Sequence, residues 1–459
     1  MNFDEIRELT RREDVDYLEI RLEESFETKI QISGREVETV SQGKVSGGSA
    51  RALVSGVWGF VYFNETENLK ERVESAIDQA KTLISTSLEK VELAPVEPIE
   101  VFEELKPLKD PQEISISDKI KLFSNYSEIP FSIDKRVVNV KVTYSEKRRQ
   151  LAFANSEGTF IQRELMDLGG SIMPIASNGK EIQRAFVPFG SSVDFSVAEN
   201  LEGKINEKTL LAVNLLSADD FEGGEFPVII DQNLGGVFIH EAFGHLSEAD
   251  FISEDEKMKE IMKIGKVFGS EILNVYDVGN IFGVRGALTV DDEGVPAETV
   301  VLIKEGVLSG HLHNRETASK MKEIPSGNGR ATSFKYPPIP RMRTTYIAPQ
   351  DAKFEDFIKD INFGVYAKSS FGGQTNGELF TFVPESAYLI EGGKVTRLIK
   401  NVSLSGNVFE TLKNIVGIAD DFRITDGGGG CGKGEQFLLP VSHGSPHLYI
   451  SKAIIGGKK

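Results

Sequence analysis

The chain has 459 residues, of which 40% are hydrophobic and 27% charged, and its formal net charge is −18. This composition is typical of a globular protein with two or three domains, and its acidity argues against a broad face that binds nucleic acid directly. No segment has the roughly 20 apolar residues that span a bilayer, and the charged N-terminus lacks the apolar core of a signal peptide. Because one cysteine, Cys431, cannot form an intramolecular disulfide, we expect a cytoplasmic protein without membrane contact.

Residues 1–219 alternate between helical and strand periodicity. We expect them to form an α+β domain of antiparallel sheets with covering helices. Helical spacing of apolar residues predicts helices over residues 3–13, 69–84, 113–127 and 199–216. A two-residue period predicts strands over residues 17–22, 28–32, 51–63, 137–142, 150–155, 159–174 and 182–189. The glycine- and serine-rich residues 44–49 indicate a turn, and the proline-rich residues 89–111 indicate a connector.

Residues 220–459 are expected to form a β-rich domain that carries one functionally important helix. A short strand over residues 227–231 leads through a glycine-containing loop into that helix, residues 237–250. Further strands are predicted over residues 288–290, 299–303, 307–312, 344–347, 379–382, 386–390 and 394–398. Further helices are predicted over residues 254–266, 354–359 and 409–414.

The predicted helix over residues 237–250 contains His240, Glu241 and His245. Two imidazoles and a carboxylate this close together are the parts of a hydrolytic zinc site: two nitrogen ligands and a general base. The spacing is one residue longer than the common His-Glu-x-x-His pattern, and residues i and i+5 lie about 140° apart on a regular α-helix. The helix must therefore widen into a π-bulge or break, and Gly244 stands where such a distortion costs little.

A catalytic zinc ion usually has three protein ligands, so the two histidines leave one ligand missing. Cys431 is one candidate, because it lies among glycines that permit a close backbone approach and beside Lys433, which favours a thiolate. The residues alone leave nearby acids and the other four histidines open as ligands: His311, His313, His443 and His447. The pair His311 and His313 is a second possible metal pair if it lies on one face of a strand.

Several glycine-rich and acidic segments allow further interpretations. Residues 427–433 match the start of a phosphate-binding loop, but Gly434 replaces the required Ser or Thr and a strand pattern follows, which argues against a nucleotide site. Asp291–Gly294 is expected to be a solvated acidic turn. The candidates for binding an extended peptide are Gly372, Gly373, Gln374, Asn328 and Arg330 in two glycine-rich loops, together with His443, which could line the site.

Five segments together resemble the TldD/PmbA family in order and approximate spacing: His240–His245, Asp291–Gly294, Gly327–Arg330, Phe371–Gln374 and Gly430–Lys433. In this family, TldD-type subunits carry the metal motif and act as zinc metallopeptidases, whereas PmbA-type (TldE) subunits lack the motif and serve as partners. The chain resembles the TldD type. The resemblance implies that His240, His245 and Cys431 bind Zn²⁺ and that Glu241 is the general base. Glu435, where the family pattern has glycine, is a local departure.

The resemblance also implies a function and an assembly. It implies hydrolysis of unfolded or flexible polypeptides, and a homodimer or a heterodimer with a PmbA-type subunit. Two alternatives stay open. One is a non-catalytic, metal-containing regulatory or partner subunit, since members of the family have a reputation as modulators of DNA gyrase. The other is a metal hydrolase that acts on substrates other than peptides.

Overall fold

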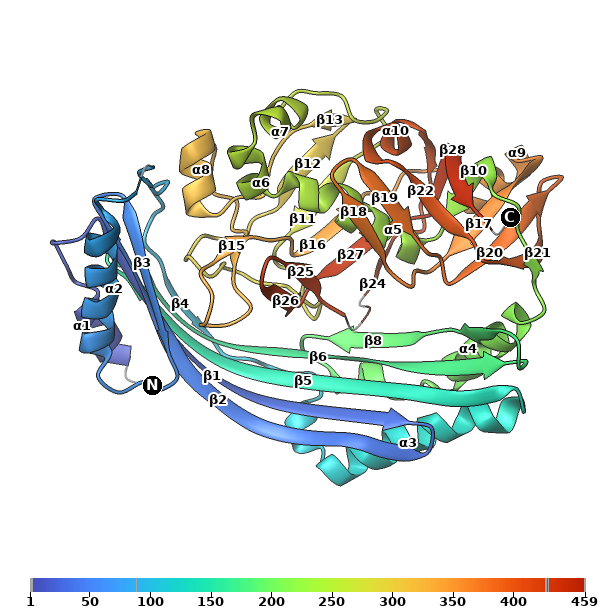
Figure 1. Ribbon diagram of the computed structural model, residues 1–459, viewed down its shortest axis with the longest axis horizontal. Coiled ribbons are helices and arrows are strands. Elements are labelled where there is room, and N and C mark those ends of the chain that lie inside the picture. Colours follow the sequence, from blue (N-terminus) through green and yellow to red (C-terminus); the bar gives the residue numbers. More distant parts are fainter. Residues whose placement is uncertain (1–2, 88, 426, 428, 458–459) are drawn as a thin grey trace.

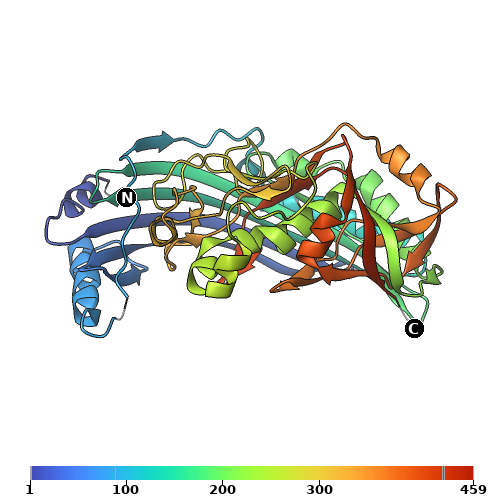
Figure 2. The ribbon, with the colours of Figure 1, turned by 90° about the horizontal axis from the view of Figure 1, so that it is seen from above.

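The computed structural model describes residues 3–457 except 88, 426 and 428, and these residues form two parts in contact. A long curved sheet comes from the N-terminal half, and a β-rich body from the C-terminal half lies over its concave side (Figure 1). Seen from above, the long strands run along the length of the molecule beneath that body (Figure 2). The predicted fold class, antiparallel sheets with covering helices followed by a β-rich part that carries the His-Glu motif, is confirmed. The boundary at residue 219 stays a prediction.

The N-terminal sheet has eight strands in the order β3-β2-β1-β5-β6-β4, with β7 and β8 also paired to β6. All of its pairings are antiparallel except that of β4 with β6. The strands are β1 (Tyr17–Ser33), β2 (Glu36–Val54), β3 (Val57–Phe63), β4 (Glu100–Glu103), β5 (Val137–Asn155), β6 (Phe160–Ser177), β7 (Ile182–Arg184) and β8 (Val187–Ser191). The short β4 lies inside the segment that was predicted to be only a connector.

The turn predicted over residues 44–49 is wrong, because these residues continue β2 without a break. Lys44 pairs with Phe26 and Ser49 with Arg21, so β1 and β2 run together along almost their whole length. This segment contains glycines because a side chain would not fit at these positions. A Cβ atom on Gly47 would lie 2.4 Å from both the Phe334 ring and the Phe63 carbonyl oxygen. Glycine here marks the close approach of the C-terminal body to the sheet.

Helices cover the side of the long sheet that faces away from the body. Their bounds are α1 (Phe3–Leu9), α2 (Leu69–Leu83), α3 (Ile116–Ile133) and α4 (Glu202–Leu215), with 3₁₀ turns η1 (Pro111–Glu113) and η2 (Phe195–Ala198). The four predicted helices are thus confirmed with shifted ends. Helix α2 packs on β2 and β3 through Val73, Ala76 and Ile77, which are buried at helical spacing. Gly59 permits this contact, since a Cβ atom there would lie 1.9 Å from the Ala76 carbonyl oxygen.

The C-terminal body contains a mixed ten-stranded sheet and a six-stranded sheet. The larger has the order β18-β19-β22-β28-β10-β17-β20-β21-β9 with β23 also on β28, and the smaller has the order β13-β12-β11-β16-β27-β24. The larger is built from β9 (Asp219–Asp220), β10 (Gly224–Ile230), β17 (Phe363–Lys368), β18 (Gly373–Asn376), β19 (Leu379–Phe382), β20 (Ser386–Glu391), β21 (Lys394–Lys400), β22 (Ser403–Asn407), β23 (Ile415–Ile418) and β28 (Leu448–Gly456). The smaller is built from β11 (Val275–Val278), β12 (Val300–Lys304), β13 (Val307–Leu308), β16 (Thr344–Ile347), β24 (Arg423–Thr425) and β27 (Ser442–Ser445).

Two short hairpins and several helices complete this body. They are β14 (Gly329–Arg330) with β15 (Ile339–Pro340), β25 (Cys431–Lys433) with β26 (Gln436–Leu439), and helices α5 (Gln232–Ile239), α6 (Ala249–Glu254), α7 (Glu256–Ile261), α8 (Arg315–Met321), α9 (Phe354–Asp360) and α10 (Val408–Lys413). Three predictions are wrong. The strand predicted over residues 307–312 ends at Leu308. Residues 288–290 form no strand beyond an isolated bridge at Val290, and the helix predicted over residues 254–266 ends at Ile261, before Gly265 adopts a positive φ.

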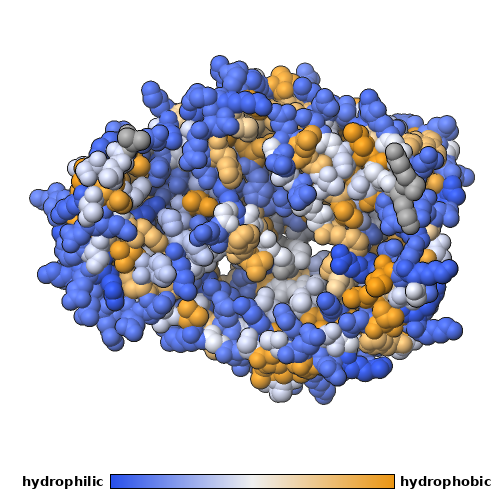
Figure 3. Space-filling model, viewed as in Figure 1, coloured by the Kyte–Doolittle hydropathy of each residue, from blue (hydrophilic) through white to orange (hydrophobic). Residues whose placement is uncertain are grey.

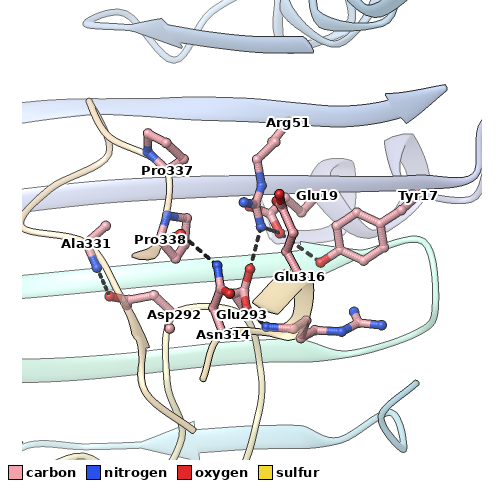
Figure 4. A network of polar contacts seen from close by, with 12 residues as sticks. Tyr17, Glu19, Arg51, Asp292, Glu293, Asn314, Glu316, Ala331, Pro337 and Pro338 are labelled. Carbon is pink, nitrogen blue, oxygen red and sulfur yellow. Dashed lines mark hydrogen bonds and ion pairs between the residues drawn. The ribbon is translucent and has the colours of Figure 1, made fainter. Parts of the chain in front are cut away.

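The acidic turn Asp291–Gly294 was predicted to be solvated, but it is buried between the two parts of the molecule (Figure 4). Arg51 on β2 donates to Glu293 Oε1 at 2.9 Å, and Arg163 on β6 donates to Asp292 Oδ1 at 2.6 Å. The other oxygen of Asp292 accepts from the Ala331 backbone N–H at 2.8 Å. Charges on the sheet that would be costly to bury alone are therefore neutralised by charges from the body.

Of the helices in the described part of the chain, none has the length and apolar character that a membrane crossing requires.

Candidate metal centre

The His-Glu motif begins where α5 ends, and α5 lies between the two sheets of the body. Asp231 caps this helix, because its side chain accepts a hydrogen bond from the Leu234 N–H at 2.9 Å. Residues His240–Gly244 form a turn of π-helix, η3, in which the backbone N–H of His245 donates to the carbonyl of His240. A 3₁₀ turn, η4 (His245–Ser247), follows. The predicted π-bulge is confirmed, and this i to i+5 closure turns His240 and His245 to one side of the helix.

Cys431 reaches the two histidines from far along the chain. It is the first residue of β25, and its Sγ lies 3.3 Å from Nε2 of His245. Potential ligand atoms of His240, His245 and Cys431 all lie within 4.8 Å of one another. The Arg341 guanidinium donates to the Cys431 carbonyl oxygen at 2.8 Å and holds the start of the β25–β26 hairpin in place.

The local charges favour a thiolate at Cys431, and a carboxylate orients the ring of His245. Burial raises the pKa of Cys431, but the hydrogen bonds and charges of His240 and His245 outweigh it and bring that pKa down to about 5. Burial lowers the pKa of His245, whereas the charge of Glu248 and the contact with Cys431 raise it, to about 11 overall. His245 Nδ1 lies 2.9 Å from Glu248 Oε2, so its N–H donates there and Nε2 faces Cys431.

Lys433 does not stabilise the thiolate, contrary to the prediction. Its Nζ lies 3.1 Å from Glu248 Oε2 and 2.7 Å from Asp250 Oδ1, and it also donates to the Pro340 carbonyl. Glu248 is fully buried, and burial by itself raises the pKa of its carboxyl group. The charges of Lys433 and His245 outweigh burial and lower that pKa. The lysine thus stabilises the carboxylate that orients His245.

These residues fit a zinc ion. Two imidazoles and one thiolate are a known catalytic zinc set, and a bound cation itself favours the thiolate form of a cysteine. Nδ1 of His240 is buried, and no described residue makes a hydrogen bond to it. A cation nearby would stabilise this unpaired nitrogen, which is otherwise costly to bury. Glu241 lies beside the cluster, its Oε2 3.9 Å from His245 Nε2, and its side chain is 32% exposed.

Of the other predicted site residues, His443 and β18 lie near this cluster. The His443 ring is centred 6.3 Å from that of His240, and its Nε2 has no hydrogen-bond partner among the described residues. Burial together with the charge of His240 lowers the pKa of His443 to about 3. His443 is therefore a neutral imidazole beside the site. Gly373 and Gln374 belong to β18, which contacts η3, and Gly372 directly precedes this strand.

Asn328 and Arg330 are placed inside the fold. The Asn328 amide donates to Asp277 Oδ1 and to the Arg341 carbonyl, both at 2.9 Å. Arg330 donates to the backbone carbonyls of Met342 and Pro440. Both side chains are buried, so we do not include these two residues in the substrate site proposed below.

Glu248, Arg341 and Met342 support the site and were missed by sequence reasoning. The signal for Glu248 was its place three residues after His245, where a carboxylate can reach the ring nitrogen opposite the metal. Arg341 and Met342 reach the site only through the tertiary fold, so no local pattern indicates them.

A cavity of about 890 Å³ lies between the long sheet and the body. It is lined by Arg163 and Asp167 from β6 and by Leu438 and Pro440 at the β26 end, and the space-filling view shows the surface hollowed between the two parts (Figure 3). Cys431 pairs with Leu439 in the β25–β26 hairpin, so this hairpin forms a wall between the cavity and the histidine cluster.

Replacement of Gly244 tests the packing behind the π turn. Its φ of −57° and ψ of −50° are ordinary helical values, so glycine is required for space: a Cβ atom would lie 2.0 Å from Sδ of the buried Met342. We expect Gly244→Val to destabilise the fold by about 1–3 kcal/mol and to weaken zinc binding, measured by chemical denaturation and zinc titration. The double variant Gly244→Ala/Met342→Ala should recover binding relative to Gly244→Ala, and equal losses in both would contradict this explanation.

The fold and the site together define a class: a two-part, β-rich protein in which a π-bulged helix and a hairpin bring two histidines, a cysteine and a partly exposed glutamate together as a candidate metalloenzyme centre. Family models match nearly the whole chain, as PmbA/TldA metallopeptidase domain 1 over residues 18–83, the central domain over residues 109–221 and the C-terminal domain over residues 223–457. The chain therefore belongs to the PmbA/TldA metallopeptidase family, as the resemblance to the TldD/PmbA family had predicted.

Individual relatives agree with this membership. A metalloprotease of Synechocystis sp. is 40% identical over 96% of this chain and 95% of its own. A metalloprotease TldD homolog of Haemophilus influenzae is 33% identical over 90% of this chain and 86% of its own. The crystal structure of TldE from Thermococcus kodakarensis has the same fold, with a TM-score of 0.76 over 99% of both chains at 20% identity.

Proposed function

We propose that the protein is a zinc-dependent metallopeptidase that hydrolyses peptide bonds in unfolded or flexible polypeptides. The observation that carries the proposal is the convergence of His240, His245 and Cys431 beside the partly exposed carboxylate of Glu241. The names of relatives support it, since many are called metalloproteases and one, from Saccharolobus solfataricus, is called a zinc metalloprotease TldD homolog.

The chain's own residues then have distinct roles. A zinc ion bound by these three residues would polarise the scissile carbonyl and make a water molecule more acidic. Glu241 is next to a ligand but outside the ligand set, so its carboxylate accepts the proton of the attacking water and delivers it to the leaving amine. Glu248 holds the His245 ring through Nδ1 and keeps Nε2 aimed at the site.

The substrate is proposed to bind as an added strand along β18. Among the described strands, β18 is at the end of its sheet's order, and it contacts the π turn that carries His240 and Glu241. It pairs with β19 through a two-residue turn in which Asn376 faces Leu379. Because hydrogen-bonded pairs alternate away from such a turn, the N–H of Thr375 points away from β19. Backbone pairing there would be indifferent to substrate sequence.

Thr375→Pro tests this edge by removing one outward N–H. We expect the KM for an unfolded peptide to rise roughly threefold to tenfold, which corresponds to about 1 kcal/mol for one backbone hydrogen bond, while the zinc content is unchanged. The matched control is Thr375→Val, which keeps the N–H and the side-chain shape. If KM rises equally in both variants, the side chain matters and the proposed backbone pairing is wrong.

The zinc centre itself is tested by Cys431→Ser. Serine keeps the size of the side chain but is not deprotonated near neutral pH, so we expect the bound zinc and the rate of peptide cleavage to fall together. Zinc content by mass spectrometry and cleavage of an unfolded fluorogenic peptide are measured side by side. Full zinc affinity in the variant would remove Cys431 from the ligand set, and zinc binding without any peptide cleavage in the wild type would favour a non-catalytic subunit.

Two further features of the proposal concern assembly and location. We expect the protein to act as a homodimer or as a heterodimer with a PmbA-type (TldE) subunit, in the cytoplasm. Analytical ultracentrifugation of the isolated chain, with and without such a subunit, separates the two kinds of dimer.

A further inference from the structure

A second group of metal-ligating side chains lies outside the proposed zinc site. Potential ligand atoms of His311, His313 and Glu323 all lie within 4.8 Å of one another. The two histidines are 3% and 1% exposed, whereas the Glu323 side chain is 28% exposed. The sequence suggested that these histidines could lie on one face of a strand, but they lie in the segment between β13 and α8.

The contacts of His311 fix which of its nitrogens carries hydrogen. Its Nε2 lies 2.7 Å from the carbonyl oxygen of Met262, and a carbonyl can only accept, so Nε2 carries the hydrogen. In a neutral ring the lone pair is then on Nδ1. That nitrogen lies 3.0 Å from both carboxylate oxygens of Glu323.

The contacts of His313 permit a matching arrangement on the other side of Glu323. Its Nδ1 lies 3.1 Å from Oγ1 of Thr317, whose hydroxyl donates to the Asn314 carbonyl at 3.3 Å. When the hydroxyl hydrogen is used there, and not on the closer Nδ1, Oγ1 accepts from Nδ1–H of His313. The lone pair of a neutral His313 is then on Nε2, which lies 3.1 Å from Glu323 Oε2.

The lone pair of His311, joined by that of His313 in this arrangement, faces a carboxylate, and these groups repel unless positive charge lies between them. That charge is either one or two extra protons, which would bury imidazolium ions on one carboxylate, or a cation. We propose that His311, His313 and Glu323 bind a divalent transition-metal ion of the zinc type. Two imidazoles and a carboxylate are a zinc ligand set, and a carbonyl or hydroxyl behind each ring is the usual second contact of a metal-bound histidine.

The nitrogen–oxygen distances suit this ion after a small expansion. Ligand atoms about 2.0–2.1 Å from a tetrahedral ion lie roughly 3.3–3.4 Å apart, and the nitrogen–oxygen separations here are 3.0–3.1 Å. The exposed side of Glu323 leaves access for a water molecule as the fourth ligand. Glu323 is held in place because Lys322 ends α8 with a φ of 58° and the Glu323 N–H donates to the Ala318 carbonyl at 2.9 Å.

The ion would join three segments behind the first site. Leu312, between the two histidines, pairs with the chain just after the π turn, because its N–H donates to the Ser247 carbonyl and its carbonyl accepts from Ala249 N–H. Met262 directly follows α7 and Glu323 follows α8, and these helices lie with α6 at one end of the body (Figure 1). The second ion would therefore fasten the segment that carries Glu248, the residue that orients His245.

Metal counting on the untagged full-length chain tests this second site. We expect two zinc ions per wild-type chain, one in Cys431→Ser, one in the isosteric Glu323→Gln, and two in the control Glu271→Gln, which alters an exposed glutamate elsewhere in the body. One ion in the wild type that is lost in Cys431→Ser and kept in Glu323→Gln overturns the second site and leaves the proposed function intact. One ion with the opposite pattern supports the second site and removes the first.

A measurement in the Cys431→Ser background guards against misfolding of the single variant. Cobalt added to Cys431→Ser should give ligand-field absorption without the thiolate charge-transfer band that only Cys431 can produce, and zinc should raise its thermal midpoint. Both effects should vanish in Cys431→Ser/Glu323→Gln and persist in Cys431→Ser/Glu271→Gln. The absence of both effects in Cys431→Ser itself would assign the positive charge to protons and overturn the proposal.

Discussion

Replacing Glu241 by glutamine is expected to lower kcat for peptide cleavage by about 10²–10⁴-fold, the usual contribution of a general base. Glutamine keeps the shape of the side chain but cannot accept the proton of the attacking water. KM should change little, since Glu241 binds the reacting water and not the peptide. The measurement is steady-state cleavage of an unfolded peptide by proteins loaded with equal zinc.

Zinc content separates this role from that of a ligand. Glu241 lies 3.9 Å from His245 and is not needed to complete the cluster of His240, His245 and Cys431. We therefore expect Glu241→Gln to bind as much zinc as the wild type, and Glu254→Gln, at the exposed end of α6, to change neither quantity. Lost zinc in Glu241→Gln would make Glu241 a ligand, and an unchanged kcat with zinc bound would end the general-base assignment.

The two histidines of the metal cluster could be predicted because their spacing is local information. The spacing of His240 and His245 demands a distorted helix, and the structure has the π turn that this spacing requires. Cys431 was different: its flanking residues left other ligands open, and the family resemblance selected it. The contact arises because the β25–β26 hairpin folds back over 186 residues of sequence, which no local pattern encodes.

The long strands were predicted only in part because charged residues inside them look like turns. Arg148 and Arg149 interrupt the apolar alternation of β5, so the pattern predicted two strands where there is one. In the sheet, Arg149 donates to Glu23 on the neighbouring β1 at 3.0 Å, and Arg148 pairs with Glu164 on β6. Cross-strand pairs of opposite charge make such residues compatible with a strand, but the partner is visible only after folding.

The burial of the acidic turn Asp291–Gly294 was also missed because its charge partners are brought to it only by folding. Removal of one carboxylate from this turn should have a large effect on stability. We expect Asp292→Ala to lower the free energy of unfolding by about 3–5 kcal/mol, because it leaves buried charges uncompensated. Arg163 loses its 2.6 Å partner. Arg21 loses its ion pair with Asp292 and keeps the one with Glu23, and no described residue makes a hydrogen bond to its guanidinium. Urea unfolding at neutral pH measures the loss, and Asp351→Ala at an exposed site should change stability by less than about 0.5 kcal/mol.

The stability difference between wild type and Asp292→Ala should depend on pH, whereas a simple loss of packing would not. Burial raises the pKa of Asp292, but Arg21 and Arg163 lower it more, to about 2, against about 3.9 in an unfolded chain. A depressed pKa stabilises the fold fully above the unfolded value and loses this effect as pH falls through the folded one. The stability gap between wild type and Asp292→Ala should therefore be constant above about pH 5 and shrink between about pH 4 and pH 2. A gap that does not change with pH would mean that Asp292 acts through its shape, and that its charge does not join the sheet to the body.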